Sequence, residues 1–218
     1  MAARRRAAKK KTRRAATRDD RVPLACLIVF ALIWTGLAIA PRYREDWLLE
    51  NGLTFLLVPA AVLTYRRFRF SDRAYVQATI FLVLHTIGSH YTYSEVPFGD
   101  WLRDALDLGR NHYDRIVHFC FGLLWVRPLQ ELTFRGVPAR SPVRVVLLSI
   151  SVVVALSVVY ELIEWAVATI ADPDAGTAFL GTQGDEWDAQ KDMGLAGAGA
   201  VLAGAVELVL ARRKHALS

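Results

Sequence analysis

The sequence predicts an all-α membrane protein, a polytopic bundle of about six transmembrane helices with both termini in the cytoplasm. Three observations predict this class. Of the 218 residues, 54% are hydrophobic and 22% are charged; this is too apolar for an ordinary soluble domain and requires the charges to be segregated. Long apolar runs approach the roughly 20 residues that a helix needs to cross the hydrocarbon layer, where unpaired backbone is excluded. Lys and Arg gather in alternate connecting segments.

The predicted spans follow from these apolar runs. They lie near Val22–Ala40, Asn51–Tyr65, Ala74–Gly88, Tyr113–Thr133, Arg144–Ala171 and Met193–Ala211. The second and third runs are short, so each is either a tilted span with polar ends or a partly re-entrant segment. No internal repeat divides the chain, and residues 22–211 are therefore expected to form a single transmembrane domain.

Residues 1–21 are predicted to be a basic cytoplasmic tail without fixed structure, because they contain ten Lys or Arg and two Asp. A basic arm beside a first span anchors the topology and binds anionic lipid head groups. The rest of the chain has 17 basic and 19 acidic residues, so the net charge of +6 is no evidence for a nucleic-acid partner, and we expect none. The first apolar run is long enough to span and is expected to be retained rather than cleaved.

The orientation follows from the connecting segments, since cytoplasmic loops retain Lys and Arg. The basic segments are the tail, Arg66–Arg73, the loop with Arg135, Arg140 and Arg144, and the start of the C-terminal tail 212–218. The opposite side receives Pro41–Glu50, Ser89–His112 and Asp172–Asp192, the last with six acids and one lysine. Both termini are then cytoplasmic, an arrangement that requires an even number of spans.

Two spans carry acids and a histidine where lipid makes them costly. A charge near the bilayer centre costs at least about 2.5 kcal/mol and persists mainly where it is paired or functional. Asp114 and His118 are four residues apart in the fourth span, and Glu161 and Glu164 are three apart in the fifth. Each pair therefore shares one helix face, in the outer part of its span.

The approach to the sixth span adds Asp185, Asp188 and Asp192, whose spacings of three and four give one face if the segment is helical. Charge segregation and helix direction both place these acids at the outer end. We therefore expect them to join the acids of the fourth and fifth spans in one pocket beneath the external surface. His85, followed by His90 and Tyr93, lies where the third span emerges at the same end.

The candidate site residues are assigned roles by their chemistry. The candidate catalytic residues are His118, Asp114, Glu161 and Glu164. The candidate metal ligands are His118, Glu161, Glu164, Asp185, Asp188 and Asp192. The candidate substrate-binding residues are Arg115, His90 and Tyr93. His85 is a weaker candidate, because a single histidine at a helix end is more often only hydrogen-bonded.

Three function classes remain open. Oxygen donors with an imidazole suit a divalent metal such as Mg, Mn, Fe or Zn, in a site that acts on or binds a membrane lipid or cell-envelope component. Alternatively, Arg115 pairs with Glu161 or Glu164 in a network that is structural or binds a partner. The third class, an ion or proton transporter, needs polar residues through to the cytoplasmic side, where the sequence offers few beyond Arg127 and Glu131.

Two further features are interpreted as structural. Glu131 and Glu207 lie near the cytoplasmic ends of their spans and are expected to reach toward Arg135 or Arg212. The sixth span contains small residues from Gly194 to Gly204, which allow a neighbouring helix to approach closely. That neighbour is expected within the chain, with a homo-oligomer as the alternative.

Several motifs carry a resemblance to a known family. They are His90-Tyr91-Thr92-Tyr93, Pro97-Phe98-Gly99, Asn111–Phe119, Glu161–Trp165 and Gly181–Asp188. In this order they resemble the YjdF family of bacterial inner-membrane proteins, over nearly the whole chain after the tail. The resemblance implies a multi-pass inner-membrane protein and brings no activity with it. More distantly, the acidic series is similar to the VanZ-like proteins, associated with glycopeptide resistance and the cell envelope, although Asp192 stands where their pattern tends to have Asn.

Overall fold

The structure is a computed structural model that describes residues 19–135, 141–170 and 180–216, and every regular element in these ranges is helical. The elements are α2 (Arg21–Leu37), α3 (Arg44–Glu50), α4 (Gly52–Thr64), α5 (Asp72–Tyr91), the 3-10 helix η1 (Tyr93–Glu95), α6 (Pro97–Ala105), α7 (Tyr113–Phe134), α8 (Pro142–Ile170) and α10 (Asp188–Ala216). Most of the basic tail, Arg140 and the first residues of the acidic segment from Asp172 lie outside the described residues.

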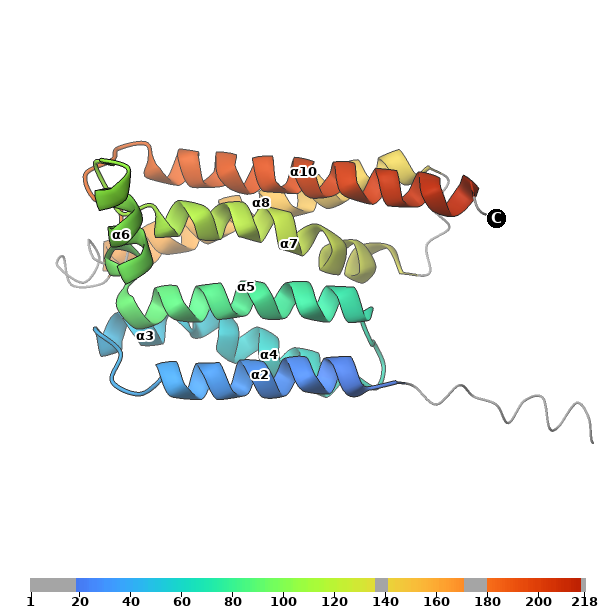
Figure 1. The fold of residues 1–218 in the computed structure, drawn as a ribbon, viewed down its shortest axis with the longest axis horizontal. Coiled ribbons are helices and arrows are strands. Elements are labelled where there is room, and N and C mark those ends of the chain that lie inside the picture. The colour runs from blue at the N-terminus through green and yellow to red at the C-terminus, as the bar shows by residue number, and fades with distance from the viewer. Residues whose placement is uncertain (1–18, 136–140, 171–179, 217–218) are drawn as a thin grey trace, which may run out of the picture.

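The long helices run side by side between two ends of the molecule (Figure 1). α3, α6 and the start of α10 lie at one end, which we call the α6 end; the start of α2 and the last turns of α10 lie at the opposite end. α7 packs against α8 and α10, and α5 joins this group to α2. The segments predicted to be external thus collect at the α6 end, while the assignment of that end to the outside remains a prediction from charge.

Two helices in the described part of the chain, α8 and α10, are long and apolar enough to cross a membrane by length and composition. α3 and α4 meet the same criteria only when taken together, and their 43° bend makes the pair either a broken third span or a re-entrant segment. Helices cover each predicted span, and the count of six crossings remains a prediction. The sixth helix begins at Asp188 instead of Met193, so Asp188 lies in its first turn and Asp192 follows one turn later.

The bend between α3 and α4 occurs at Asn51, a fully buried residue whose side chain adds hydrogen bonds to α3 and to two neighbouring helices. Its Nδ2 donates to the carbonyl of Trp47 (2.8 Å) and to Ser89 Oγ (3.1 Å), and its Oδ1 accepts from Trp34 Nε1 (2.8 Å). Glu50 precedes the break, and its carbonyl accepts from His85 Nε2 at 3.0 Å. The short second run is therefore a broken helix whose exposed backbone is satisfied by neighbouring side chains.

α7 and α10 approach so closely that their backbones touch at two glycines. A Cβ built on Gly122 would collide with the carbonyl of Ala196, and one built on Gly199 would collide with the carbonyl of Phe119. These contacts account for the small residues predicted to pack the sixth span. They fix the register of α10 against α7, and with it the positions of the acids at the start of α10.

The opposite end has its own ion pairs, and their partners differ from those expected. Glu131 pairs with Arg127 one helical turn earlier (2.7 Å), and Glu207 pairs with Arg73 (2.7 Å) and Arg127 (3.3 Å). The predicted partners Arg135 and Arg212 were wrong, because an (i, i+4) neighbour and a residue of α5 lie closer.

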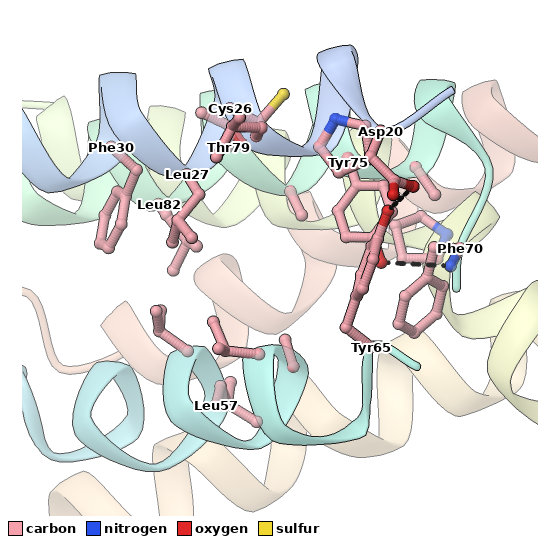
Figure 2. A pocket seen from close by; sticks show the side chains of 18 of the residues that line it. Asp20, Cys26, Leu27, Phe30, Leu57, Tyr65, Phe70, Tyr75, Thr79 and Leu82 are labelled. Atoms are coloured by element: carbon pink, nitrogen blue, oxygen red, sulfur yellow. Dashed lines mark hydrogen bonds between the residues drawn. The ribbon is translucent and has the colours of Figure 1, made fainter. Parts of the chain in front are cut away.

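An apolar cavity of about 370 Å³ lies near the opposite end among α2, α4, α5 and α7 (Figure 2). Phe30, Leu27 and Leu57 line its wall, and the ring of Tyr65 closes one end, where its hydroxyl donates to Asp20.

Candidate functional site

Three of the predicted site residues converge near the α6 end, the predicted metal ligands His118 and Asp192 and the predicted catalytic residue Asp114. α7 supplies Asp114 and His118 from one face, and α10 supplies Asp192. One ligand atom from each of the three residues lies within 4.8 Å of the other two. His118 is 8% exposed and Asp192 is 2% exposed, so the cluster faces the interior of the bundle.

Glu161 of α8 lies beside this cluster, next to His118. His118 Nε2 lies 3.5 Å from Asp114 Oδ1 and 3.5 Å from Glu161 Oε1. Glu161 Oε1 and Asp192 Oδ1 are buried and accept no hydrogen bond from any described residue. A buried carboxylate oxygen without a partner is costly, so these two atoms require a cation or a proton.

Two further acids of the predicted set, Asp185 and Asp188, are neutralised by cations of the protein. Arg110 and Arg115 both contact Asp188, with Arg115 Nη2 at 3.2 Å from Oδ1 and Arg110 Nη2 at 3.3 Å from Oδ2. Asp185 pairs with Arg115 and with Lys191 Nζ (2.6 Å). Arg115 was expected to pair with Glu161 or Glu164 in the structural alternative, and the structure pairs it with Asp185 and Asp188 instead.

The electrostatics of Asp185 agree with this pairing. Hydrogen bonds from Lys191, from the amide of Trp187 and from Arg115 lower the pKa of the Asp185 carboxyl below its usual range. Asp185 therefore remains ionised as the partner of cations at the surface, and the structure does not bring it or Asp188 into the cluster of ligand atoms around His118.

Arg110 is the residue that sequence reasoning missed at this end. Its side chain is buried, and besides Asp188 it donates to the carbonyls of Thr182 (3.0 Å) and Gly181 (3.2 Å). The adjacent Asn111 is fully buried and donates to the carbonyl of Val96 at 3.0 Å. No local pattern in the sequence signals this role, because the partners of Arg110 at Gly181, Thr182 and Asp188 lie more than 70 residues later in the chain.

Glu164 is not among the clustered ligand atoms around His118, and it lines a small pocket with Glu50 and Tyr160. The Tyr160 hydroxyl donates to Glu50 Oε2 at 3.1 Å, and the Tyr160 ring lies 6.3 Å from that of His118. Glu50 was not selected from the sequence, because it appeared to belong to an external loop rather than to a helix.

The histidines of α5 and Tyr93 have partners of their own. His90 Nδ1 contacts the carbonyl of Leu37 at 2.7 Å and so ties α5 to the end of α2. The Tyr93 hydroxyl contacts His85 Nδ1 at 2.5 Å. Because the Glu50 carbonyl can only accept, His85 donates from Nε2, and in the neutral ring Nδ1 accepts from Tyr93. The structure thus places His90 and Tyr93 in contacts between segments, outside the metal-ligand cluster.

Comparison with known proteins agrees with this architecture. Residues 22–213 match the family described as "Predicted membrane protein (DUF2238)". The inner membrane protein YjdF of Escherichia coli (strain K12) is 36% identical over 169 residues, which cover 78% of this chain and 79% of YjdF. No solved structure gives a significant match. These matches confirm the predicted resemblance and the predicted inner-membrane localisation, while the VanZ-like similarity remains a prediction. The chain belongs to the DUF2238 family of predicted membrane proteins.

Proposed function

We propose that this inner-membrane protein holds a divalent metal at its external face and uses it to act on a lipid or cell-envelope component. Asp114, His118 and Asp192 are the proposed ligands, with Glu161 as the fourth. The observation that carries the proposal is the convergence of three ligand atoms within 4.8 Å, in a cluster where Asp192 Oδ1 and the neighbouring Glu161 Oε1 are buried and accept no hydrogen bond from a described residue.

The donor set favours a particular chemistry. One imidazole with carboxylates from adjacent helices is the composition of metal sites built inside helical bundles. Zn, Mn or Fe would bind such a set more tightly than a set of oxygen ligands alone. A metal bound there would supply Lewis acidity or an activated water. The side chains of this chain would hold it, and Glu161 would act as ligand or proton acceptor.

The ion pairs of Arg110 and Arg115 support the same proposal, because they position a proposed metal ligand. Arg110 and Arg115 hold Asp188, which lies one helical turn before Asp192. Because α10 starts at Asp188, these pairs fix the start of the helix that carries the proposed ligand Asp192. Such contacts orient ligands and are expected around a metal that must be bound with precise geometry.

The competing interpretation is a purely structural polar network, and the ion pairs of Arg110 and Arg115 with Asp188 are equally consistent with it. It leaves Asp192 Oδ1 without a hydrogen bond from any described residue, and it leaves Glu161 Oε1 with only His118 Nε2, at 3.5 Å, as a neighbour. Transport has less support, because a cluster of buried apolar side chains separates the polar groups of the two ends. The members of this cluster are Val126, Leu129, Val153, Ala200 and Ala203.

Elemental analysis tests the proposal. The wild-type protein, purified in detergent without chelator, should contain stoichiometric metal, and His118→Ala and Asp192→Asn should lose it. Glu207→Gln is the matched control, because it also neutralises a buried acid of α10, at the opposite end. Wild-type protein free of metal, or Asp192→Asn with as much metal as wild type, would overturn the proposal.

Thermal unfolding separates the metal site from the structural network. A metal that binds the folded state stabilises it by mass action. Added metal should therefore raise the unfolding temperature of wild type and of Glu207→Gln, and leave that of Asp192→Asn unchanged. A structural network predicts that Asp192→Asn alters stability equally with and without added metal.

A further inference from the structure

We propose that the pocket between the broken helix α3–α4 and α8 binds the head group of an ammonium-bearing membrane phospholipid, which enters sideways from the bilayer. The inference names the substrate class of the metal site and in that sense rests on the proposed function. The binding event itself has its own residues and its own measurement.

The pocket has a polar floor and an apolar rim. Glu50, Tyr160 and Glu164 bring polar atoms to it, and its volume is about 210 Å³. This is smaller than the roughly 300–1,000 Å³ of typical ligand pockets, so it has room for a head group and not for a whole lipid. The hydrocarbon chains of a bound lipid would therefore remain outside it.

Glu50 is the residue that most needs a ligand. Its side chain is 6% exposed, yet only Oε2 has a hydrogen-bond partner among the described residues, the hydroxyl of Tyr160. The helix break at Asn51 fixes its position, because His85 binds the freed carbonyl of Glu50. A buried carboxylate with a free oxygen at a pocket is an acceptor that a donor group would satisfy.

Charge selects the kind of donor. Two carboxylates, Glu50 and Glu164, line the pocket, and none of its described lining residues is Lys, Arg or His. An anionic head group would meet uncompensated negative charge. An ammonium group has three donors and a positive charge, and it complements both acids.

The rim indicates that the ligand comes from the membrane. Leu49, Leu53 and Ile163 line the pocket and are also 41%, 39% and 44% exposed on the outside of the helices. In a membrane-spanning bundle these surfaces face hydrocarbon. A lipid could leave its chains on this rim while its head group reaches the acids, whereas a water-soluble ligand would have to cross it.

Tyr160 connects the pocket to the proposed metal site. Its hydroxyl binds Glu50, its ring lies 6.3 Å from the ring of His118, and the next residue, Glu161, approaches His118. A head group in the pocket would therefore lie beside the metal ligands, within the same end of the bundle.

Lipid binding to detergent-purified full-length protein tests the proposal, with native mass spectrometry comparing phosphatidylethanolamine and phosphatidylglycerol of identical chains. Wild type should prefer phosphatidylethanolamine. Glu50→Gln should weaken its binding roughly ten- to a hundredfold, the usual value of a hydrogen bond to a charged group. Leu53→Trp, which fills the rim from an exposed position, should have a similar effect. Ala78→Leu, in the other cavity, is the control and should bind as wild type.

Metal content measured on the same samples separates this inference from the proposed function. Glu50→Gln should retain metal and lose lipid, and His118→Ala should lose metal and retain lipid. If no metal is found but phosphatidylethanolamine binding depends on Glu50 and Leu53, the lipid inference stands without the metal. Equal binding of both lipids, or undiminished binding by Leu53→Trp, would overturn it even if Glu50→Gln failed to fold.

Discussion

A methyl group added at Gly199 tests the packing that builds the site. In wild type the backbones of α7 and α10 meet at this residue. A Cβ on Gly199 would lie 2.8 Å from the amide nitrogen of Leu123 and closer still to the carbonyl oxygen of Phe119. Both neighbours are helix backbone, which cannot rotate away as a side chain can. Gly199→Ala therefore forces the two helices apart.

The magnitude follows from these distances. Ordinary contacts of a Cβ begin near 3.4 Å, so the helices must separate by roughly 1 Å, and overpacking of this kind costs about 1–3 kcal/mol. Metal ligands tolerate deviations of only about 0.2 Å. Because His118 is on α7 and Asp192 is on α10, the same shift should weaken metal binding.

Gly197→Ala is the matched control on the same helix. A Cβ there meets only Val154 Cγ2, at an ordinary 3.7 Å. Removing a glycine from a helix interior stabilises it by up to about 1 kcal/mol, so Gly197→Ala should unfold at or above the wild-type temperature. Thermal unfolding and metal content in the same detergent measure both variants. Gly199→Ala as stable as Gly197→Ala, with metal retained, would refute this account of the α7–α10 contact.

Three further perturbations have defined outcomes. Arg110→Gln removes one of two cations from the buried Asp188 and should lower the free energy of unfolding by about 3–5 kcal/mol; denaturation at the wild-type midpoint would contradict the pairing. Asn51→Ala removes three hydrogen bonds from the break and should cost about 2–4 kcal/mol, and an unchanged unfolding curve would count against the break as drawn. Because the folded pKa of Asp185 is lowered, its contribution is present above the ordinary pKa of an aspartate and is lost as the pH falls through the folded value. Asp185→Asn should therefore unfold below wild type at neutral pH, and the difference should shrink in acid; a difference independent of pH would show that Lys191 and Arg115 do not stabilise the carboxylate.

The convergence around His118 illustrates what periodicity and charge can predict. An (i, i+4) spacing places Asp114 and His118 on one face whatever the helix packs against, and the structure has them 3.5 Å apart. The alternation of basic and acidic segments predicted that α7, α8 and α10 bring their acids to one end. Both arguments use only distances along a helix and its direction.

The partners of these acids could not be predicted in the same way. Arg110 binds Asp188, 78 residues later in the chain, and no local pattern records that pairing. Asp185 and Asp188 were therefore grouped with the metal ligands, although neighbouring cations neutralise them. A buried polar network is specified by tertiary packing, and only coordinates assign its partners.

The helix boundaries show a similar division. The break at Asn51 is set by contacts with Trp34 and Ser89 on other helices, so the lengths of the apolar runs could not predict it. The short helix α6 was not predicted either, because a charged segment of nine residues is too short and too polar to be read as a span. Pro97 at its first position was a local signal that could have located it.

The most direct test of the account is X-ray absorption spectroscopy of the purified protein loaded with Zn²⁺. Coordination by His118, Asp114 and Asp192 predicts a nitrogen and oxygen shell near 2.0–2.2 Å with the multiple scattering of an imidazole. That imidazole signature should disappear in His118→Ala and persist in Glu207→Gln. A wild-type spectrum without the imidazole signature would contradict a metal centre at this cluster. A spectrum of His118→Ala identical to that of wild type would contradict it as well.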